Sequence, residues 1–247
     1  SDGIVNETEI EWNDAKQHVR ARSVRKLGAV VLREQLLEPA GEEITRSLIE
    51  GIRRTGLRCL PWEKESQQFR SRVQWVRRSI KETSEWPNLL DETLTETLER
   101  WLAPFLDGMW KLDQLQRLDL AEILRSMFTH QQLRELDRLA PSQLLVPSGS
   151  HITLDYTPTD HPALSVKLQE LFGLTETPCV GGGTIPVTIH LLSPAARPLA
   201  VTQDLRSFWE NVYPEIRKQL RARYPKHPWP ENPLAAAPTR RTIKRHR

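Results

Sequence analysis

The sequence predicts an α+β protein, because the spacing of its apolar residues changes twice along the chain. Between about residues 9 and 33 the apolar residues follow strand-like spacing. From about residue 39 they recur every three or four positions, and after Pro141 they alternate with polar residues. We therefore expect a short β segment, a helical bundle, and then a small, mostly antiparallel β-sheet with a C-terminal helix and an extended Pro/Trp strap.

The first segment, residues 1–38, has too few strands to form a domain alone. Ile10, Trp12 and Val19 mark its early strands, and Val30-Val31-Leu32 marks a later one. Such a short run of strands indicates the last part of a β-barrel or sheet. The sequence opens on Ser rather than Met, and we expect it to be a piece of a larger protein.

Residues 39–140 show the periodicity of a helical bundle. The first helix has Gly56 at the position after its end, where glycine is favoured. The second helix has an Arg/Lys/Gln-rich face opposite its apolar face. The apolar stripes contain Ile44, Leu48, Ile49 and Ile52, then Phe69, Val73, Val76 and Ile80, then Leu94, Leu98, Trp101 and Leu102, with three shorter helices in residues 111–139.

Residues 141–224 predict four or five strands and a final helix. Residues 169–172 add one helical turn that Gly173 closes. The final helix begins near Thr202, which can cap it, with Asp204 in its first turn and Pro214 as a bend or restart. The strands are marked by Ile152, Leu154 and Tyr156, by Leu164, Val166 and Leu168, by Val187, Ile189 and Leu191, and by Leu199 and Val201. The helix stripe contains Leu205, Phe208, Trp209, Val212, Ile216 and Leu220.

Composition limits the class of protein. The chain has 247 residues, of which 38% are hydrophobic and 27% charged, enough to bury one or two compact cores. No apolar run approaches the roughly 18 residues of a membrane span, and no signal peptide is recognisable. We therefore expect a cytoplasmic protein without a membrane partner. Cys59 and Cys179 lie in separate apolar stretches and are predicted to be buried free thiols.

No motif for catalysis is found. The run Gly181–Gly183 lacks the Lys of a phosphate-binding loop and is predicted to be a hairpin loop. Asp113 and Asp119 occupy helix starts, where a carboxylate caps backbone N–H groups. Asp155 is predicted to be structural, accepting hydrogen bonds from a neighbouring Arg. Because zinc and nucleophile-elbow motifs are also missing, we predict no catalytic residue, metal or cofactor in this chain.

The C-terminal end is strongly basic. Residues 205–247 contain 11 Lys or Arg against three Glu, a net charge of +8, which leaves −5 for residues 1–204. Cations interleaved with aromatic residues are typical of nucleic-acid binding without sequence preference. The alternative is a solvated helix face whose arginines pair with the acidic helical bundle. The candidate RNA-binding residues are Arg217, Lys218, Arg221, Arg223, Tyr224, Lys226, Trp229, Arg240, Arg241, Lys244 and Arg245.

Residues 225–247 are predicted to be a Pro-rich strap and a basic tail. Four prolines between Pro225 and Pro233 favour an extended, polyproline-like strap on the surface. The tail from Arg240 onward is too charged to pack, and we expect it to contact RNA more readily than the helix does.

A specific resemblance is concentrated in residues 141–241. The segments that carry it, in order, are Pro147-Ser-Gly-Ser150, Ile152-Thr-Leu-Asp-Tyr156, Leu168-Gln-Glu-Leu-Phe-Gly173, His190-Leu-Leu-Ser-Pro194, Arg197-Pro198, Val201-Thr-Gln-Asp-Leu205, Phe208-Trp209 and Arg223-Tyr-Pro-Lys-His-Pro-Trp-Pro230. With these segments the chain resembles the C-terminal end of the HrpB family of DExH-box ATP-dependent RNA helicases. The helical half is similar more loosely. Ala222 and Asn232 stand where the family commonly has Gly and Asp.

The resemblance implies a parent helicase with two RecA-like ATPase domains outside this chain. ATP and Mg²⁺ are then expected for the parent, and none of the family's nucleotide-binding residues has a matching position here. Residues 1–38 would end an OB-like region. The implied function is a non-catalytic accessory region that braces the helicase core of the same polypeptide and assists RNA binding. The alternatives are a protein-interaction platform, formed by the strap and the small sheet, and an independent enzyme.

Overall fold

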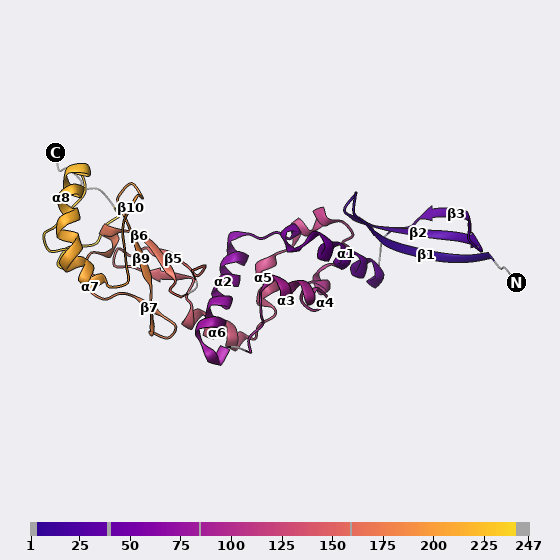
Figure 1. Cartoon of the computed structure of the whole chain (residues 1–247), viewed down its shortest axis with the longest axis horizontal. Helices are drawn as coiled ribbons and strands as arrows, with labels where there is room; N and C mark the ends of the chain where they lie inside the picture. The colour runs from indigo at the N-terminus through magenta and orange to yellow at the C-terminus, as the bar shows by residue number, and fades with distance from the viewer. Residues whose placement is uncertain (1–3, 39–40, 84, 159, 241–247) are drawn as a thin grey trace. The chain divides into compact units, whose positions relative to one another are not determined.

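The computed structural model describes residues 4–38, 41–83, 85–158 and 160–240 (Figure 1). The chain forms two compact units, and the division between them falls within a helix. The first contains Ser1–Arg70 and Pro87–Thr129, and the second contains Ser71–Trp86 and His130–Arg247. This division differs from the domain boundaries predicted at 38, 140 and 224, which stay a prediction.

The first unit begins with a three-stranded antiparallel sheet in the order β1-β2-β3. Its strands are β1 (Ile4–Asn13), β2 (His18–Leu27) and β3 (Val30–Leu36). Alternation along β2 buries Val19 and Ala21 and leaves Arg20 and Arg22 partly exposed. The strands predicted in this segment are therefore confirmed, whereas the OB-like assignment stays a prediction.

Helix α1 (Glu42–Thr55) packs against this sheet through a glycine. Gly51 is buried, and a Cβ atom placed on it would lie 2.4 Å from an indole carbon of Trp12. Only glycine lets the Trp12 ring approach the helix backbone so closely. Gly56 ends α1 with φ +86°, as predicted, and Ile44, Leu48 and Ile52 form the buried face of the helix.

The remaining helices of the first unit are short. The predicted stripe from Leu94 to Leu102 belongs to two helices, interrupted at Thr97, and the Trp101 indole N–H donates to Leu94 O at 2.9 Å. The elements are η1 (Leu57–Cys59), the start of α2 (Lys64–Ser79), α3 (Asp91–Glu96), α4 (Leu98–Trp101), η3 (Ala103–Phe105), η4 (Leu112–Arg117) and α5 (Leu120–Arg125).

The two predicted aspartate caps have different outcomes. Asp119 caps α5 as predicted, accepting the Glu122 N–H at 3.0 Å. Asp113 does not cap η4, because it lies inside the first turn. The side-chain carbonyl of Gln114 accepts the N–H groups of Trp110 and Lys111 instead, at 2.8 and 2.9 Å.

The second unit contains a five-stranded sheet in the order β10-β9-β6-β5-β4. Only the β6–β9 pair is parallel, so the predicted mostly antiparallel sheet is confirmed. The strands are β4 (Gln143–Leu145), β5 (His151–Asp155), β6 (Ala163–Lys167), β9 (Thr188–Leu192) and β10 (Pro198–Thr202). β10 is an edge strand, and Val201 on it is 61% exposed rather than part of the core.

The predicted turns of this unit are confirmed. Residues Leu168–Leu171 form the 3₁₀ turn η5, and Gly173 follows at φ +87°. Gly181–Gly183, all with positive φ, connect the two-stranded hairpin β7 (Cys179–Val180) and β8 (Ile185–Pro186).

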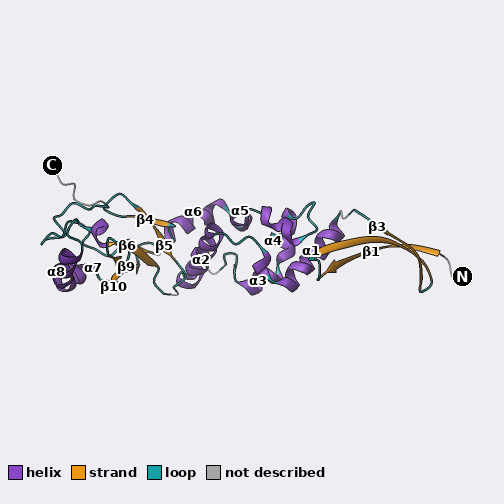
Figure 2. Cartoon of the chain, turned by 90° about the horizontal axis from the view of Figure 1, so that it is seen from above, coloured by secondary structure: helices purple, strands orange, loops and turns teal. Residues whose placement is uncertain are grey.

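The polar face predicted for α2 is partly buried. Arg72 is 6% exposed, donates to Ala140 O at 2.6 Å and pairs with Asp137 of α6 (His130–Leu139) at 2.5 Å. Trp75 is fully buried and lies edge-on to Tyr156, with 5.3 Å between the ring centroids. The C-terminal half of α2 is therefore part of the core of the second unit. Further elements are η2 (Lys81–Thr83), α7 (Leu205–Ser207), the π-helical segment Phe208–Val212 and α8 (Tyr213–Arg223). Figure 2 labels α7 and α8 among the helices.

Three smaller predictions need correction. Asp204, not Thr202, caps the final helix by accepting the Ser207 N–H at 2.9 Å. Cys179 is exposed and Cys59 half-buried, so neither is a buried thiol, although both are free. Asp155 accepts a hydrogen bond from the backbone N–H of Thr157 at 2.9 Å rather than from an arginine.

Among the described helices, none is long and apolar enough to cross a membrane.

Candidate nucleic-acid interface

The buried face of the C-terminal helix includes Leu205, Phe208, Trp209 and Leu220, as predicted, but departs from the predicted stripe at Val212. The π-helical segment Phe208–Val212 places one extra residue in its turn. The stripe therefore continues through Tyr213, which is buried, rather than through Val212, which is 41% exposed. This shift by one position also turns Arg217, four residues after Tyr213, toward the protein. The side chain of Arg217 is accordingly only 18% exposed.

The Pro/Trp strap is held by its backbone carbonyl groups. Arg217 Nε donates to Trp229 O at 2.8 Å, and the Tyr213 hydroxyl donates to Pro230 O at 2.9 Å. A third contact comes from η5, where Gln169 Nε2 donates to Pro228 O at 3.1 Å. Burial raises the pKa of Tyr213 to about 12, so its hydroxyl remains a donor at neutral pH. Prolines lack an N–H, and the strap is therefore fixed through the acceptors that it still has.

Two predicted RNA-binding residues, Arg217 and Trp229, make contacts within the protein. Arg217 holds the strap and also lies 3.4 Å from Glu231. Trp229 is 6% exposed, and its indole N–H donates to Tyr224 O at 2.9 Å. A base can stack only on an exposed ring face. The structure thus gives Trp229 the place of a core residue rather than that of a stacking platform.

Tyr224 and Lys218 are intermediate cases. Tyr224 is half-buried, with its hydroxyl 3.4 Å from Ser193 Oγ and the Arg223 guanidinium 6.0 Å from its ring centroid. Lys218 is exposed and pairs with Glu215 at 3.2 Å. The carboxylates that pair with Arg217 and Lys218 belong to the C-terminal segment itself, and not to the helical bundle as the alternative prediction required.

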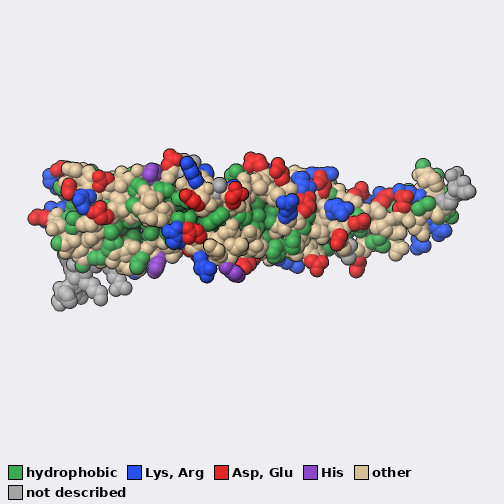
Figure 3. Space-filling view, turned by 90° about the horizontal axis from the view of Figure 1, so that it is seen from below, with side chains coloured by type: hydrophobic (Ala, Val, Ile, Leu, Met, Phe, Trp, Pro, Cys, Tyr) green, Lys and Arg blue, Asp and Glu red, His purple; other side chains and the backbone are tan. Residues whose placement is uncertain are grey.

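Four of the predicted cations are exposed and form what we call the exposed basic set: Arg221, Arg223, Lys226 and Arg240. Within the described residues, no carboxylate lies within ion-pair distance of any of the four. They come from the end of α8, the start of the strap and the first residue of the tail. Arg241, Lys244 and Arg245 lie outside the described residues. On the face in Figure 3, by contrast, Lys/Arg and Asp/Glu side chains are interspersed.

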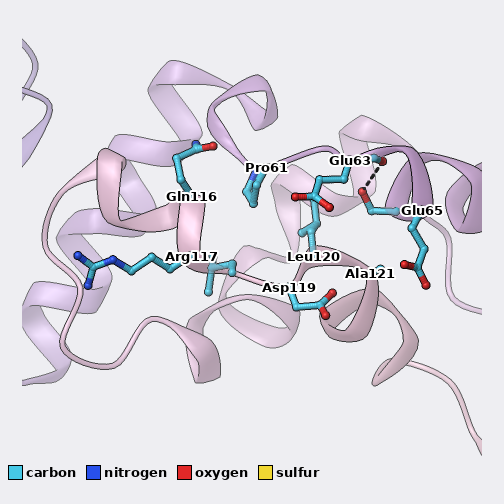
Figure 4. A pocket seen from close by; sticks show the side chains of 10 residues that line it. Pro61, Glu63, Glu65, Gln116, Arg117, Asp119, Leu120 and Ala121 are labelled. Atoms are coloured by element: carbon cyan, nitrogen blue, oxygen red, sulfur yellow. Dashed lines mark hydrogen bonds between the residues drawn. The ribbon is translucent and has the colours of Figure 1, made fainter.

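The first unit contains an acidic hollow of about 260 Å³, in which several carboxylates lie near one another (Figure 4). It lies at the start of α2 and of α5 and is lined by Glu63, Glu65 and Asp119. Glu65 pairs with Arg125 at 2.7 Å, and Asp119 serves as the cap of α5. In the described part of the chain, no three His, Cys, Asp or Glu side chains are placed to hold a metal ion.

A buried carboxylate in η5, Glu170, is not among the predicted site residues. Glu170 is 7% exposed, and its side chain accepts hydrogen bonds from the hydroxyl groups of Ser148, at 2.8 Å, and Ser150. These contacts attach the Pro147–Ser150 turn to η5. The two serines lie at least 20 residues before Glu170 in the sequence, so local spacing gave no signal of this role.

Comparison with known proteins identifies the class. A family described as "ATP-dependent helicase C-terminal" matches residues 101–233, more than half of the chain. A second family, "ATP-dependent RNA helicase HrpB, connector region", matches residues 4–37. More than half of the chain thus belongs to a family of helicase C-terminal regions.

Individual relatives identify the family. The chain is 38% identical over 236 residues to the ATP-dependent RNA helicase HrpB of Escherichia coli K12. Its fold matches the crystal structure of the E. coli DExH-box NTPase HrpB with a TM-score of 0.80 and 37% identity, covering 97% of this chain and 30% of that one. A structure of E. coli DEAH/RHA helicase HrpB gives a TM-score of 0.69, 34% identity and coverage of 92% and 29%. The chain belongs to the HrpB family, and it spans 29% of the length of the E. coli protein.

Proposed function

We propose that this region is a non-catalytic accessory module of an HrpB-like RNA helicase, which assists RNA binding and braces the helicase core. ATP, Mg²⁺ and the cytoplasmic location belong to the proposal for the whole helicase. The observation that supports RNA binding is the exposed basic set at the C-terminal end. Cations without a carboxylate partner can neutralise phosphates, and the released counterions then favour binding.

The experiment is a salt titration of RNA affinity with the whole chain. Arg221, Arg223 and Lys226 are replaced by Gln together, and binding of a labelled oligouridylate is followed by fluorescence anisotropy. If each cation contacts one phosphate of a single strand, the slope of log affinity against log salt falls by about 2 in the triple variant.

The matched control removes three exposed arginines from helices of the predicted bundle: Arg46, Arg100 and Arg134 are replaced by Gln. This variant has the same net charge as the first. Equal losses in the two variants would show that only net charge matters, and a flat slope in the unaltered chain would remove RNA from the proposal.

The bracing part of the proposal is supported by the exposed apolar side chains of the three-stranded sheet. Val30, Val31 and Leu36 on β3 are 61, 53 and 69% exposed, and Ile4 and Val5 on β1 are about half exposed. Contiguous exposed apolar residues are typical of surfaces that another protein region covers. We infer that the preceding part of the helicase polypeptide covers this sheet.

This inference is tested in the full-length helicase with Val30→Asp and Leu36→Asp combined. RNA-stimulated ATPase activity and resistance to limited proteolysis are expected to fall, because charged residues would have to be desolvated at the contact. The control is Leu145→Asp, an equally exposed leucine on β4 at 67%. If both variants behave alike, the sheet is not the bracing surface.

The interaction-platform alternative is less well supported by the contacts. The carbonyl groups of residues 228–230 in the strap already accept hydrogen bonds from Gln169, Tyr213 and Arg217. Deleting residues 224–247 distinguishes the two functions. Retained RNA binding with lost ATPase coupling in the parent would favour the platform.

A further inference from the structure

A hollow of about 500 Å³ lies in the first unit, far along the sequence from the exposed basic set. It is formed by the β1–β2 turn, the first residues of β2, the end of β3 and the loop before η4. Its lining includes Lys16, His18, Arg20, Trp110 and Lys111. None of the described residues that line it is acidic, although the first 204 residues carry a net charge of −5.

Backbone hydrogen bonds hold the separate parts of this hollow together. Val19 N donates to Trp110 O at 2.8 Å, and Leu112 N donates to Gln17 O at 3.1 Å. The turn is fixed by Lys16 N, which donates to the Asn13 side chain at 2.9 Å. Cations from two segments about 95 positions apart (16 and 111) are thus brought to one hollow before any ligand arrives, which lowers the entropy cost of binding.

The cations Lys16, Arg20 and Lys111 differ in how far nearby carboxylates compensate their charge. Arg20 pairs with Glu34 at 2.6 Å, so part of its charge is compensated. The Lys111 ammonium lies 4.1 Å from the centroid of the Trp110 ring, which positions it without neutralising it. Trp110 is itself held by an edge contact with His18 at 5.8 Å. Lys16 is exposed in the turn.

We propose that this hollow binds phosphate groups of the RNA backbone, with Lys16 and Lys111 as the main contacts and Arg20 as a weaker one. It would be a second RNA contact, separate from the exposed basic set. Because one face of Trp110 is occupied by Lys111, the contact is with phosphates rather than by base stacking. The choice of RNA as the source of the phosphates rests on the proposed function.

The test uses the whole chain with Lys16→Gln and Lys111→Gln combined. Affinity for oligouridylate is measured against salt, and the log–log slope is expected to fall by about 1.4 for two lost phosphate contacts. The matched control is Arg25→Gln with Arg33→Gln, two exposed cations that oppose each other on β2 and β3 outside the hollow. The control should change the slope clearly less. Equal changes in both variants would overturn the proposal.

A rescue variant separates charge from folding. Lys111→Arg keeps the cation and its contact with the Trp110 ring and should retain the slope of the unaltered chain. If Lys111→Arg binds as weakly as Lys111→Gln while thermal unfolding of both is unchanged, the ammonium is not a phosphate contact, and the proposal fails.

Two further arms identify the ligand and separate this proposal from the first. Inorganic tripolyphosphate is titrated by calorimetry. Binding that disappears in the Lys16/Lys111 variant, with RNA affinity intact, would assign the hollow to free polyphosphate and overturn the RNA assignment. The Arg221/Arg223/Lys226 variant is measured beside it. If RNA affinity falls only in the Lys16/Lys111 variant, the hollow is an RNA contact and the C-terminal interface is not. If RNA affinity falls only in the Arg221/Arg223/Lys226 variant, the proposal for the hollow fails and the C-terminal interface stands.

Discussion

The three-stranded sheet and the C-terminal helix are both rich in cations, but they use them differently. In the sheet, Glu9 lies opposite Arg22 in the β1–β2 register and also receives Lys26, both at 2.6 Å. At the C-terminal end, Arg221 and Lys226 are exposed without such partners in the described residues. The number of cations in a segment therefore does not tell which of them can meet a phosphate. In the sheet, the strand register places carboxylates opposite the cations, whereas no strand partner does so at the C-terminal end.

Both regions are nevertheless attached through a tryptophan. Trp12 of β1 lies over Gly51 of α1, and Trp229 of the strap is buried, with its carbonyl oxygen accepting a hydrogen bond from Arg217 of α8. The comparison predicts that each tryptophan region contributes to stability, whereas RNA affinity depends on exposed cations alone. Substitutions at these positions test whether stability and RNA affinity are separate.

The largest expected effect is that of Trp229→Ala. Removing a buried indole should lower the free energy of unfolding by about 3–5 kcal/mol, because a cavity forms and the strap loses its anchor. Urea unfolding followed by circular dichroism measures the loss. Trp229→Leu is the informative companion, since it keeps apolar volume but cannot stack. It should bind RNA as the unaltered chain does, and a clear loss of affinity in a folded Trp229→Leu chain would restore the stacking role.

A smaller change in the free energy of unfolding is expected for Gly51→Ala, and whether it is a loss or a gain depends on Trp12. Alanine favours a helix over glycine by about 1 kcal/mol. Here the added methyl group would overlap the Trp12 ring, and overpacking of this kind costs about 1–3 kcal/mol. We therefore expect a net loss of about 1 kcal/mol in urea unfolding. In a Trp12→Ala background the same substitution should stabilise, and a loss there as well would show that the ring contact is not the cause.

Much of the fold could be predicted from apolar spacing, and the errors have local physical causes. The strands of residues 9–33, the glycine at 56 and the hairpin at 181–183 follow from periodicity and turn chemistry. The burial of Arg217 could not be predicted, because a π-helical turn moves the helix stripe by one residue, and a regular 3.6-residue period cannot show such a turn. Hydrogen bonds between distant residues buried Arg72, and this too is invisible to local spacing.

For the candidate sites, charge counting found the C-terminal end but not the hollow at Lys16 and Lys111. The two lysines are separated by most of the first unit in sequence, and only the pairing of β2 with the loop at Trp110 brings them together. The burial of Trp229 could not be predicted from the sequence either. A tryptophan between basic residues is typical of a stacking platform, yet its burial is decided by the fold of the strap.

The smallest predicted effect concerns the sheet's ion pairs and their dependence on pH. The hydrogen bond from Lys26, aided by Arg22, lowers the pKa of Glu9 below its ordinary value of 4.5. A carboxyl whose pKa is lowered on folding stabilises the protein above its unfolded pKa, and this stabilisation is lost as the pH falls through the folded pKa. The melting temperature of Glu9→Gln should therefore lie slightly below that of the unaltered chain at pH 7, and the difference should shrink below pH 4.5.

Because these ion pairs are partly exposed, added salt should also reduce the difference in melting temperature at pH 7. Glu11→Gln, on the same strand and exposed, serves as the control. A difference for Glu9→Gln that persists in acid would mean that packing, rather than the ion pairs, distinguishes the sheet from the C-terminal helix.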